Sequence, residues 1–221
     1  MKKIFMCGVC SFCLAASCLF ILPSCSKSVD YISYISENRR AVYLCKEDTY
    51  ELKVFCSDRE TPYCADGVKG DMTTVCEIYY KCTTSPSCVV AEVGDFNGEM
   101  NYMSVTGSFY LSFSANIFDE ENLTVKLTID GKESEINARN VFEAGTIDWK
   151  SALNSVVEYD RERFDNLTQR NRFLGEIGVR LIYDDGCYYY VSVCDREKKV
   201  KAYLVDGKSG RIITERESQS E

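Results

Sequence analysis

The 221-residue sequence contains no histidine, and this absence excludes several kinds of active site. Ser-His-Asp and Cys-His hydrolases, zinc sites with histidine ligands and HExxH metalloproteases all depend on an imidazole group. Carboxylate pairs, Ser-Lys chemistry and metal sites with oxygen ligands remain open. Because no nucleophile arrangement is recognisable either, we expect a protein that is not an enzyme and that holds no cofactor or metal.

Charge is absent from residues 4–23, which follow two lysines. A basic start, an apolar stretch and a small residue before a cleavage point are the parts of a secretory signal peptide. A retained transmembrane helix is the alternative, since about 20 apolar residues can span a bilayer. The sequence Leu22-Pro23-Ser24-Cys25 resembles the lipobox of bacterial lipoproteins. The resemblance implies that residues 1–24 are a lipoprotein signal peptide and that Cys25 carries a diacylglycerol. The protein is then anchored to the cell membrane on its extracytoplasmic face.

Proline is scarce in the chain as a whole, and basic side chains are outnumbered by acidic ones. With only three prolines and 12% aromatic residues, the chain can build packed cores. Removing the first 24 residues lowers the Lys and Arg count from 26 to 24, against 34 acidic residues, so the net charge changes from −8 to −10. This acidic balance argues against nucleic acid as a partner and against electrostatic binding to an anionic membrane surface.

Cysteine, in contrast, is abundant after Cys25. The eight further cysteines are Cys45, Cys56, Cys64, Cys76, Cys82, Cys88, Cys187 and Cys194. An even number in an exported protein favours disulfides, whereas small apolar core filling is the alternative. Cys187 and Cys194 lie on opposite faces of one strand-like run and cannot join without a bend. Cys82–Cys88 is the local bridge that we favour, and no zinc spacing is present.

The pattern of apolar residues predicts a mixed β and α+β fold. Residues 25–45 are expected to form a lipid-anchored arm. Residues 46–143 contain six or seven short strands, including a hairpin signal at Asp130-Gly131, and predict an Ig-like β-sandwich. Residues 144–214 predict a long helix, from about 148 to 172 and capped by Thr146 or Asp148, packed on a small antiparallel sheet. Residues 215–221 are expected to be a polar tail.

The segment Tyr203–Ile213, YLVDGKSGRII, resembles the PepSY domain in its strand, its Asp-containing turn and its Gly-initiated last strand. The likeness covers at most residues 148–214. It implies a helix followed by antiparallel strands. It also implies a noncatalytic role in restraining peptidases or elsewhere in the cell envelope.

The loop Arg59–Asp71 is the first candidate binding segment. It holds Arg59, Tyr63 and Asp66, and loops at the end of a sandwich often carry binding residues. The alternative is a structured turn, with Pro62 fixing one angle and glycines supplying unusual ones.

The run Tyr188–Tyr190 is the second candidate. Tyr188 and Tyr190 share one strand face and could stack on a glycan or peptide, while Tyr189 points the other way. The alternative is that one of these sets fills the core. The acidic pairs and triplets at 119–121 and 184–185 could bind a hard cation, but their spacing is typical of solvated loops.

These observations favour a noncatalytic extracytoplasmic lipoprotein that binds or regulates another cell-envelope component. Its expected partners are the membrane, through the lipid on Cys25, and an envelope protein. One alternative is a PepSY-like regulator of an extracellular peptidase. Another is an envelope enzyme that uses carboxylates or thiols.

Overall fold

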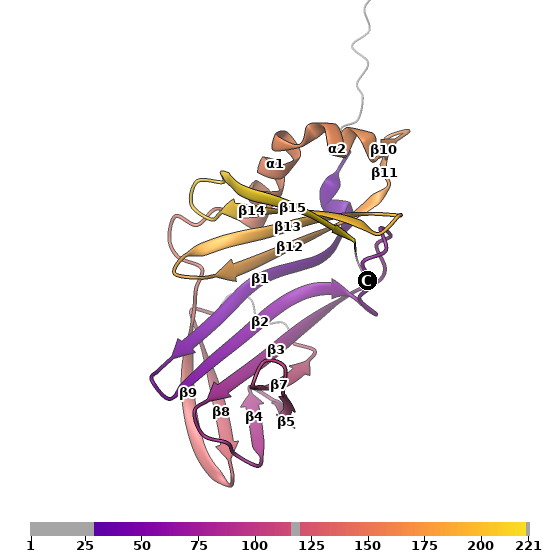
Figure 1. Cartoon of the computed structure of the whole chain (residues 1–221). Coiled ribbons are helices and arrows are strands. Elements are labelled where there is room, and N and C mark those ends of the chain that lie inside the picture. The colour runs from indigo at the N-terminus through magenta and orange to yellow at the C-terminus, as the bar shows by residue number, and fades with distance from the viewer. Residues whose placement is uncertain (1–28, 116–119, 220–221) are drawn as a thin grey trace, which may run out of the picture.

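The computed structural model describes residues 29–115 and 120–219, so Cys25, the signal segment and Asp119 lie outside it (Figure 1). Strands dominate this part of the chain: thirteen form one sheet and two pair separately. The elements are η1 (Tyr31–Tyr34), β1 (Ile35–Lys46), β2 (Tyr50–Glu60), β3 (Met72–Cys82), β4 (Val89–Val93), β5 (Phe96–Glu99), β6 (Asn101–Met103), β7 (Ser108–Phe113), β8 (Asn122–Ile129), β9 (Lys132–Asn140), α1 (Trp149–Tyr159), α2 (Arg161–Asn166), β10 (Thr168–Gln169), β11 (Arg172–Phe173), β12 (Gly175–Tyr183), β13 (Cys187–Asp195), β14 (Lys199–Asp206) and β15 (Ile212–Gln219).

The prediction of an Ig-like β-sandwich followed by a separate small sheet is wrong. A sandwich needs two sheets that face each other, whereas here one sheet runs β15-β14-β13-β12-β1-β2-β3-β7-β6, and a branch β9-β8-β4-β5 leaves from β1. The sheet curls until it is nearly closed. It is antiparallel except at β1 and β12, whose residues 35–39 and 177–180 pair in parallel.

The central strand of this sheet is β1, which lies within the segment expected to be an arm. Its first half pairs with β12 and β2, and its second half pairs with β2 and β9. A shift of register between Arg39 and Ala41 separates the two halves. A bulge of this kind increases local twist and turns the strand. Because of this twist, β1 pairs with strands in both parts of the sheet. The alternation of apolar and polar residues along the sequence does not reveal such a change of direction.

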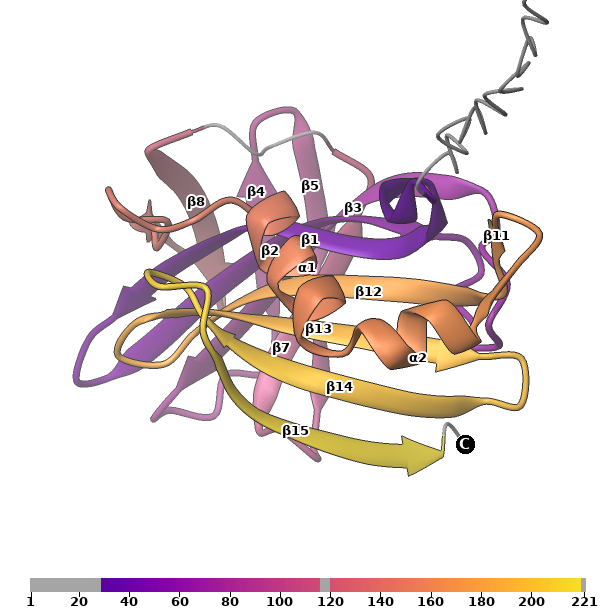
Figure 2. The same ribbon diagram turned by 90° about the horizontal axis from the view of Figure 1, so that it is seen from above.

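Two apolar cores lie on opposite faces of the sheet. The first fills the space between β1, β2, β3 and β7 on one side and β4, β8 and β9 on the other. The second lies under the helices, against β12, β13 and β14. Figure 2 shows α1 and α2 crossing these strands on one face only. On the other face of β12 and β13, here called the open face, the described residues place no helix.

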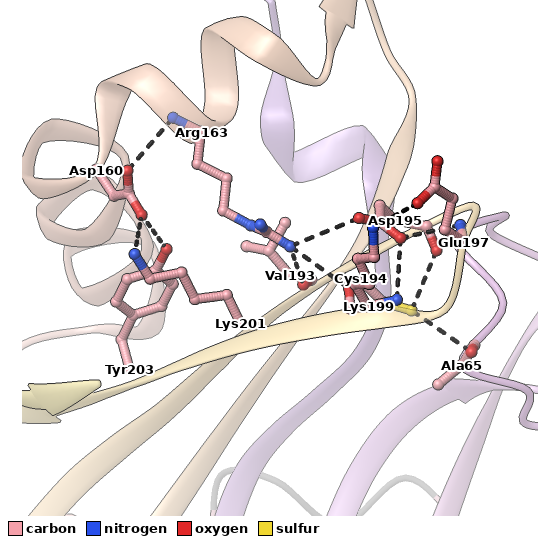
Figure 3. A network of polar contacts seen from close by, with 10 residues as sticks. All are labelled: Ala65, Asp160, Arg163, Val193, Cys194, Asp195, Glu197, Lys199, Lys201 and Tyr203. Carbon is pink, nitrogen blue, oxygen red and sulfur yellow. Dashed lines mark hydrogen bonds and ion pairs between the residues drawn. The ribbon is translucent and has the colours of Figure 1, made fainter. Parts of the chain in front are cut away.

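The long helix expected from 148 to 172 is also wrong. Asp148 caps α1 as predicted, but the helix stops at Asp160, whose backbone has φ −120° and ψ 50°. The Asp160 carboxylate accepts hydrogen bonds from the Arg163 amide, from Lys201 Nζ at 2.8 Å and from Tyr203 Oη at 2.6 Å (Figure 3). It therefore caps α2 and fixes both helices to β14. Burial alone would raise the pKa of Asp160, but the Lys201 and Tyr203 bonds outweigh it and lower the pKa.

Several local predictions agree with the structure, and others do not. Asp130 and Gly131 form the tight turn between β8 and β9, with φ values of 46° and 80°. Residues 215–219, expected as a tail, belong to β15. All eight described cysteines are free thiols, so the Cys82–Cys88 bridge is not formed.

Candidate functional site

The tyrosine run 188–190 divides between the two faces of β13. Tyr189 is 2% exposed and donates a hydrogen bond to the Ile147 carbonyl at 2.8 Å, so it belongs to the core under the helices. Tyr188 and Tyr190, which are half-buried, point to the open face because side chains alternate along a strand. The run therefore contributes one core residue and two residues to this face.

The loop between β2 and β3, residues 61–71, folds onto the far end of β13. The Glu60 carboxylate accepts the amides of Cys64 at 3.1 Å and Gly70 at 2.6 Å. The Cys194 thiol donates to the Ala65 carbonyl at 3.4 Å. A Cβ on Gly67, whose φ is +79°, would lie 2.4 Å from the Asp195 carbonyl carbon, so only glycine allows this approach. The loop is thus a structured segment held against the sheet.

The loop and the sheet bring Tyr63 and Tyr190 each to within about 6 Å of Arg180. The Arg180 Cζ lies 6.0 Å from the Tyr63 ring centre and 5.9 Å from the Tyr190 ring centre. Arg180 Nε donates to Glu37 Oε2 at 2.6 Å, and Nη2 donates to Tyr63 Oη at 3.3 Å. From β15, Arg216 donates to Tyr190 Oη at 3.3 Å. These contacts hold a cation near two aromatic rings at the surface.

A pocket of about 230 Å³ lies beside this arginine. Its lining includes Tyr63, Glu176, Arg180, Tyr190, Ser192 and Cys194. Glu176 is 2% exposed, and its Oε2 has no hydrogen-bond partner among the described residues. Burial, with the charges of Glu60 and Asp66, raises the pKa of Glu176 to about 7. Burial raises the pKa of Cys194 to about 11, so this thiol stays protonated and is a poor nucleophile.

The other predicted site residues have different surroundings. Arg59 lies opposite Glu37 in the β1–β2 register but pairs with Glu77 on β3 at 3.2 Å. Asp66 accepts the Val68 amide at 2.9 Å and so shapes its own turn. The structure therefore places Tyr63 and Tyr190 together, and leaves Arg59 and Asp66 outside the contact between the two rings and Arg180.

Sequence reasoning missed Arg180, Glu37 and Glu176. Arg180 and Glu176 are the two charged residues of the otherwise apolar strand GEIGVRLIY, and they lie an even number of positions apart. Two charged residues on the same face of an otherwise apolar strand were the sequence signal for a polar site on that face. The partner of Arg180 had no such signal, because Glu37 lies 143 residues away.

A larger cavity, about 850 Å³, is a second feature to weigh. It lies between β9 and α1, and its lining includes Arg40, Arg139, Asp148 and Trp149. Asp148 already caps α1, and Arg40 pairs with Asp58 at 2.9 Å. These polar groups are engaged in holding the fold, so we regard the Arg180 pocket as the better candidate.

The described residues contain no group of three or more side chains able to hold a metal ion. Over the same ranges, we find no helix with the length and apolar character to cross a bilayer. No family model, no curated protein and no solved structure matches this chain.

Proposed function

We propose that this protein is a noncatalytic lipoprotein, anchored through Cys25 outside the cytoplasm, which binds another cell-envelope protein through Tyr63, Arg180 and Tyr190. The observation that carries the binding part is the cluster on the open face in which Arg180 lies within about 6 Å of the Tyr63 and Tyr190 rings. Tyrosine and arginine are enriched among the interface residues whose replacement by alanine weakens protein–protein binding most. The anchor is inferred from the lipobox resemblance.

The site is suited to binding because its side chains are already positioned. Glu37 holds the Arg180 guanidinium, and the Glu60 contacts hold the loop that carries Tyr63. A partner then loses less side-chain and loop entropy on docking, which improves affinity without additional contacts. Tyr63 is 40% exposed, so its ring is accessible to a partner.

The chemistry of the pocket also favours binding over catalysis. Its thiol is protonated, and its buried carboxyl titrates near neutral pH without a nucleophile activated beside it. Covalent catalysis usually requires a nucleophile that lies within hydrogen-bond distance of a base that activates it.

The test is crosslinking on intact cells that express the tagged full-length protein, followed by mass spectrometry of the captured proteins. Tyr190→Ala should reduce capture of the dominant partner at least tenfold, about 1.4 kcal/mol. Tyr188→Ala is the matched control, since it removes the same group two positions away on the same strand face.

A captured extracellular peptidase would select the regulator form of the proposal, and a transporter or cell-wall enzyme would select an accessory role. Equal loss of capture in both variants, or no specific capture by the wild type, would contradict the proposed site. Absence of a diacylglyceryl group on Cys25, measured by mass spectrometry of the membrane-bound wild-type protein, would contradict the anchor.

A further inference from the structure

A third pocket lies on the sheet where β1, β2 and β12 meet. Its volume is about 170 Å³. Its lining is mainly apolar and consists of Val42, Leu44, Phe55, Ile182 and Tyr183, with Arg39 and Lys53 as the two charged members. None of these residues belongs to the pocket beside Arg180.

Arg39 is a cation with unsatisfied hydrogen-bonding capacity in this pocket. Its Cζ lies 4.2 Å from the centre of the Phe55 ring. Its Nε is buried and has no partner among the described residues. The nearby carboxylates are engaged elsewhere, because Glu37 binds Arg180 and Glu77 binds Arg59. Arg39 itself forms no ion pair with a described carboxylate.

Electrostatics around Arg39 point to an anion. Burial lowers the pKa of Arg39, with Glu37 opposing that effect and Arg180 adding to it. An arginine remains protonated at neutral pH even so. Arg39 is half-buried, and leaving a charge unpaired where it is partly removed from water costs free energy. Lys53 adds a second positive group, with Nζ 2.7 Å from Glu51 and a side chain 40% exposed.

The apolar lining limits which anion can bind. A cavity of about 150 Å³ lined by aliphatic and aromatic side chains can hold a benzene molecule. The volume here is similar, at about 170 Å³. Leu44, Phe55 and Ile182 give no hydrogen bonds from their side chains, so a phosphate dianion would be poorly solvated. A monoanion with an apolar body matches both the lining and the charge.

We propose that this pocket binds a small organic monocarboxylate, with its carboxylate on the Arg39 guanidinium and its apolar body against Val42, Leu44, Phe55 and Ile182. An arginine suits this role because its planar fork can donate two parallel hydrogen bonds to a carboxylate. The size of the cavity limits the ligand to one ring or a short branched chain. This site is independent of the protein-binding function proposed above.

The test is titration calorimetry of the full-length protein in a nonionic detergent, with benzoate as the probe and benzamide as its neutral analogue. Benzoate should bind at least tenfold more tightly than benzamide, about 1.4 kcal/mol, because only benzoate offers a carboxylate to Arg39. Arg39→Gln should weaken benzoate at least tenfold and remove the preference over benzamide.

Two further variants separate binding from folding. Ile182→Phe fills part of the cavity while keeping Arg39, and should abolish binding of both probes. Arg40→Gln removes the neighbouring arginine, which pairs with Asp58, and should leave benzoate affinity unchanged. Equal affinity for benzoate and benzamide, undiminished binding in Ile182→Phe, or no heat with benzoate at millimolar concentration would overturn the proposal.

Discussion

Oxidation during refolding should join Cys56 to Cys76. The two residues are directly opposite in the β2–β3 register, and both are fully buried. Cys76 Sγ donates to Cys56 Sγ across 2.9 Å. A disulfide requires about 2.05 Å, so the sulfurs must approach by about 0.9 Å. In the reaction each thiol loses one proton, and the two electrons pass to an added disulfide such as oxidised glutathione.

The expected gain in stability follows from the length of the closed loop. Chain-entropy arguments for a loop of about 20 residues give about 3 kcal/mol, less any strain in the native sheet. Urea unfolding of the oxidised and reduced proteins measures this difference in the free energy of unfolding. The reaction is run during refolding because the hydrogen bond with Cys76 and burial raise the pKa of Cys56, so native thiolate is scarce.

Peptide mapping after alkylation in denaturant identifies the bond. Cys187 and Cys194 are the internal control, because their thiols donate to Val141 and Ala65 from opposite faces of β13. A map in which Cys56 is alkylated, and therefore not in a disulfide, would refute the inference from strand register. So would a map in which Cys187 is joined to Cys194 before Cys56 is joined to Cys76.

Three other predictions concern single positions. Asp160→Asn should cost about 2–3 kcal/mol at pH 7 through weaker bonds to Lys201 and Tyr203. Since the fold lowers the pKa of Asp160, that stabilisation is lost as the pH falls below about 4, so urea unfolding at pH 3 should show a smaller difference. The fold raises the pKa of Glu176 from 4.5 to about 7, so the free energy of unfolding of the wild type should decrease as the pH rises from 4.5 to about 7. Glu176→Gln should remove this fall and be more stable at pH 8 by up to about 3 kcal/mol in thermal or urea unfolding; an unchanged pH profile would contradict the assignment. Gly67→Ala should destabilise the loop by about 1–3 kcal/mol, seen as faster amide exchange over residues 61–71, and unaltered exchange would argue against tight packing on β13.

The errors of the sequence prediction have identifiable causes. Apolar spacing across residues 148–167 fits one helix, but the Asp160 side chain prefers bonds to Lys201 and Tyr203, which lie about 40 residues away. The β1 strand was expected as an arm because its polar residues obscure the alternation. Ser36, Glu37 and Asn38 are buried in the sheet, where Glu37 pairs with Arg180.

Local chemistry in the sequence determined the tight turn at Asp130-Gly131, a helix cap at either Thr146 or Asp148, and the opposite directions of Tyr189 and Tyr190. Each depends on backbone preferences within a few residues, which a sequence displays directly. Only the tertiary structure decided that Tyr63 and Tyr190 share Arg180, since the Tyr63–Arg180 contact joins residues 117 positions apart. Strand order in the sheet sets such contacts, and it depends on how distant strands pair and twist.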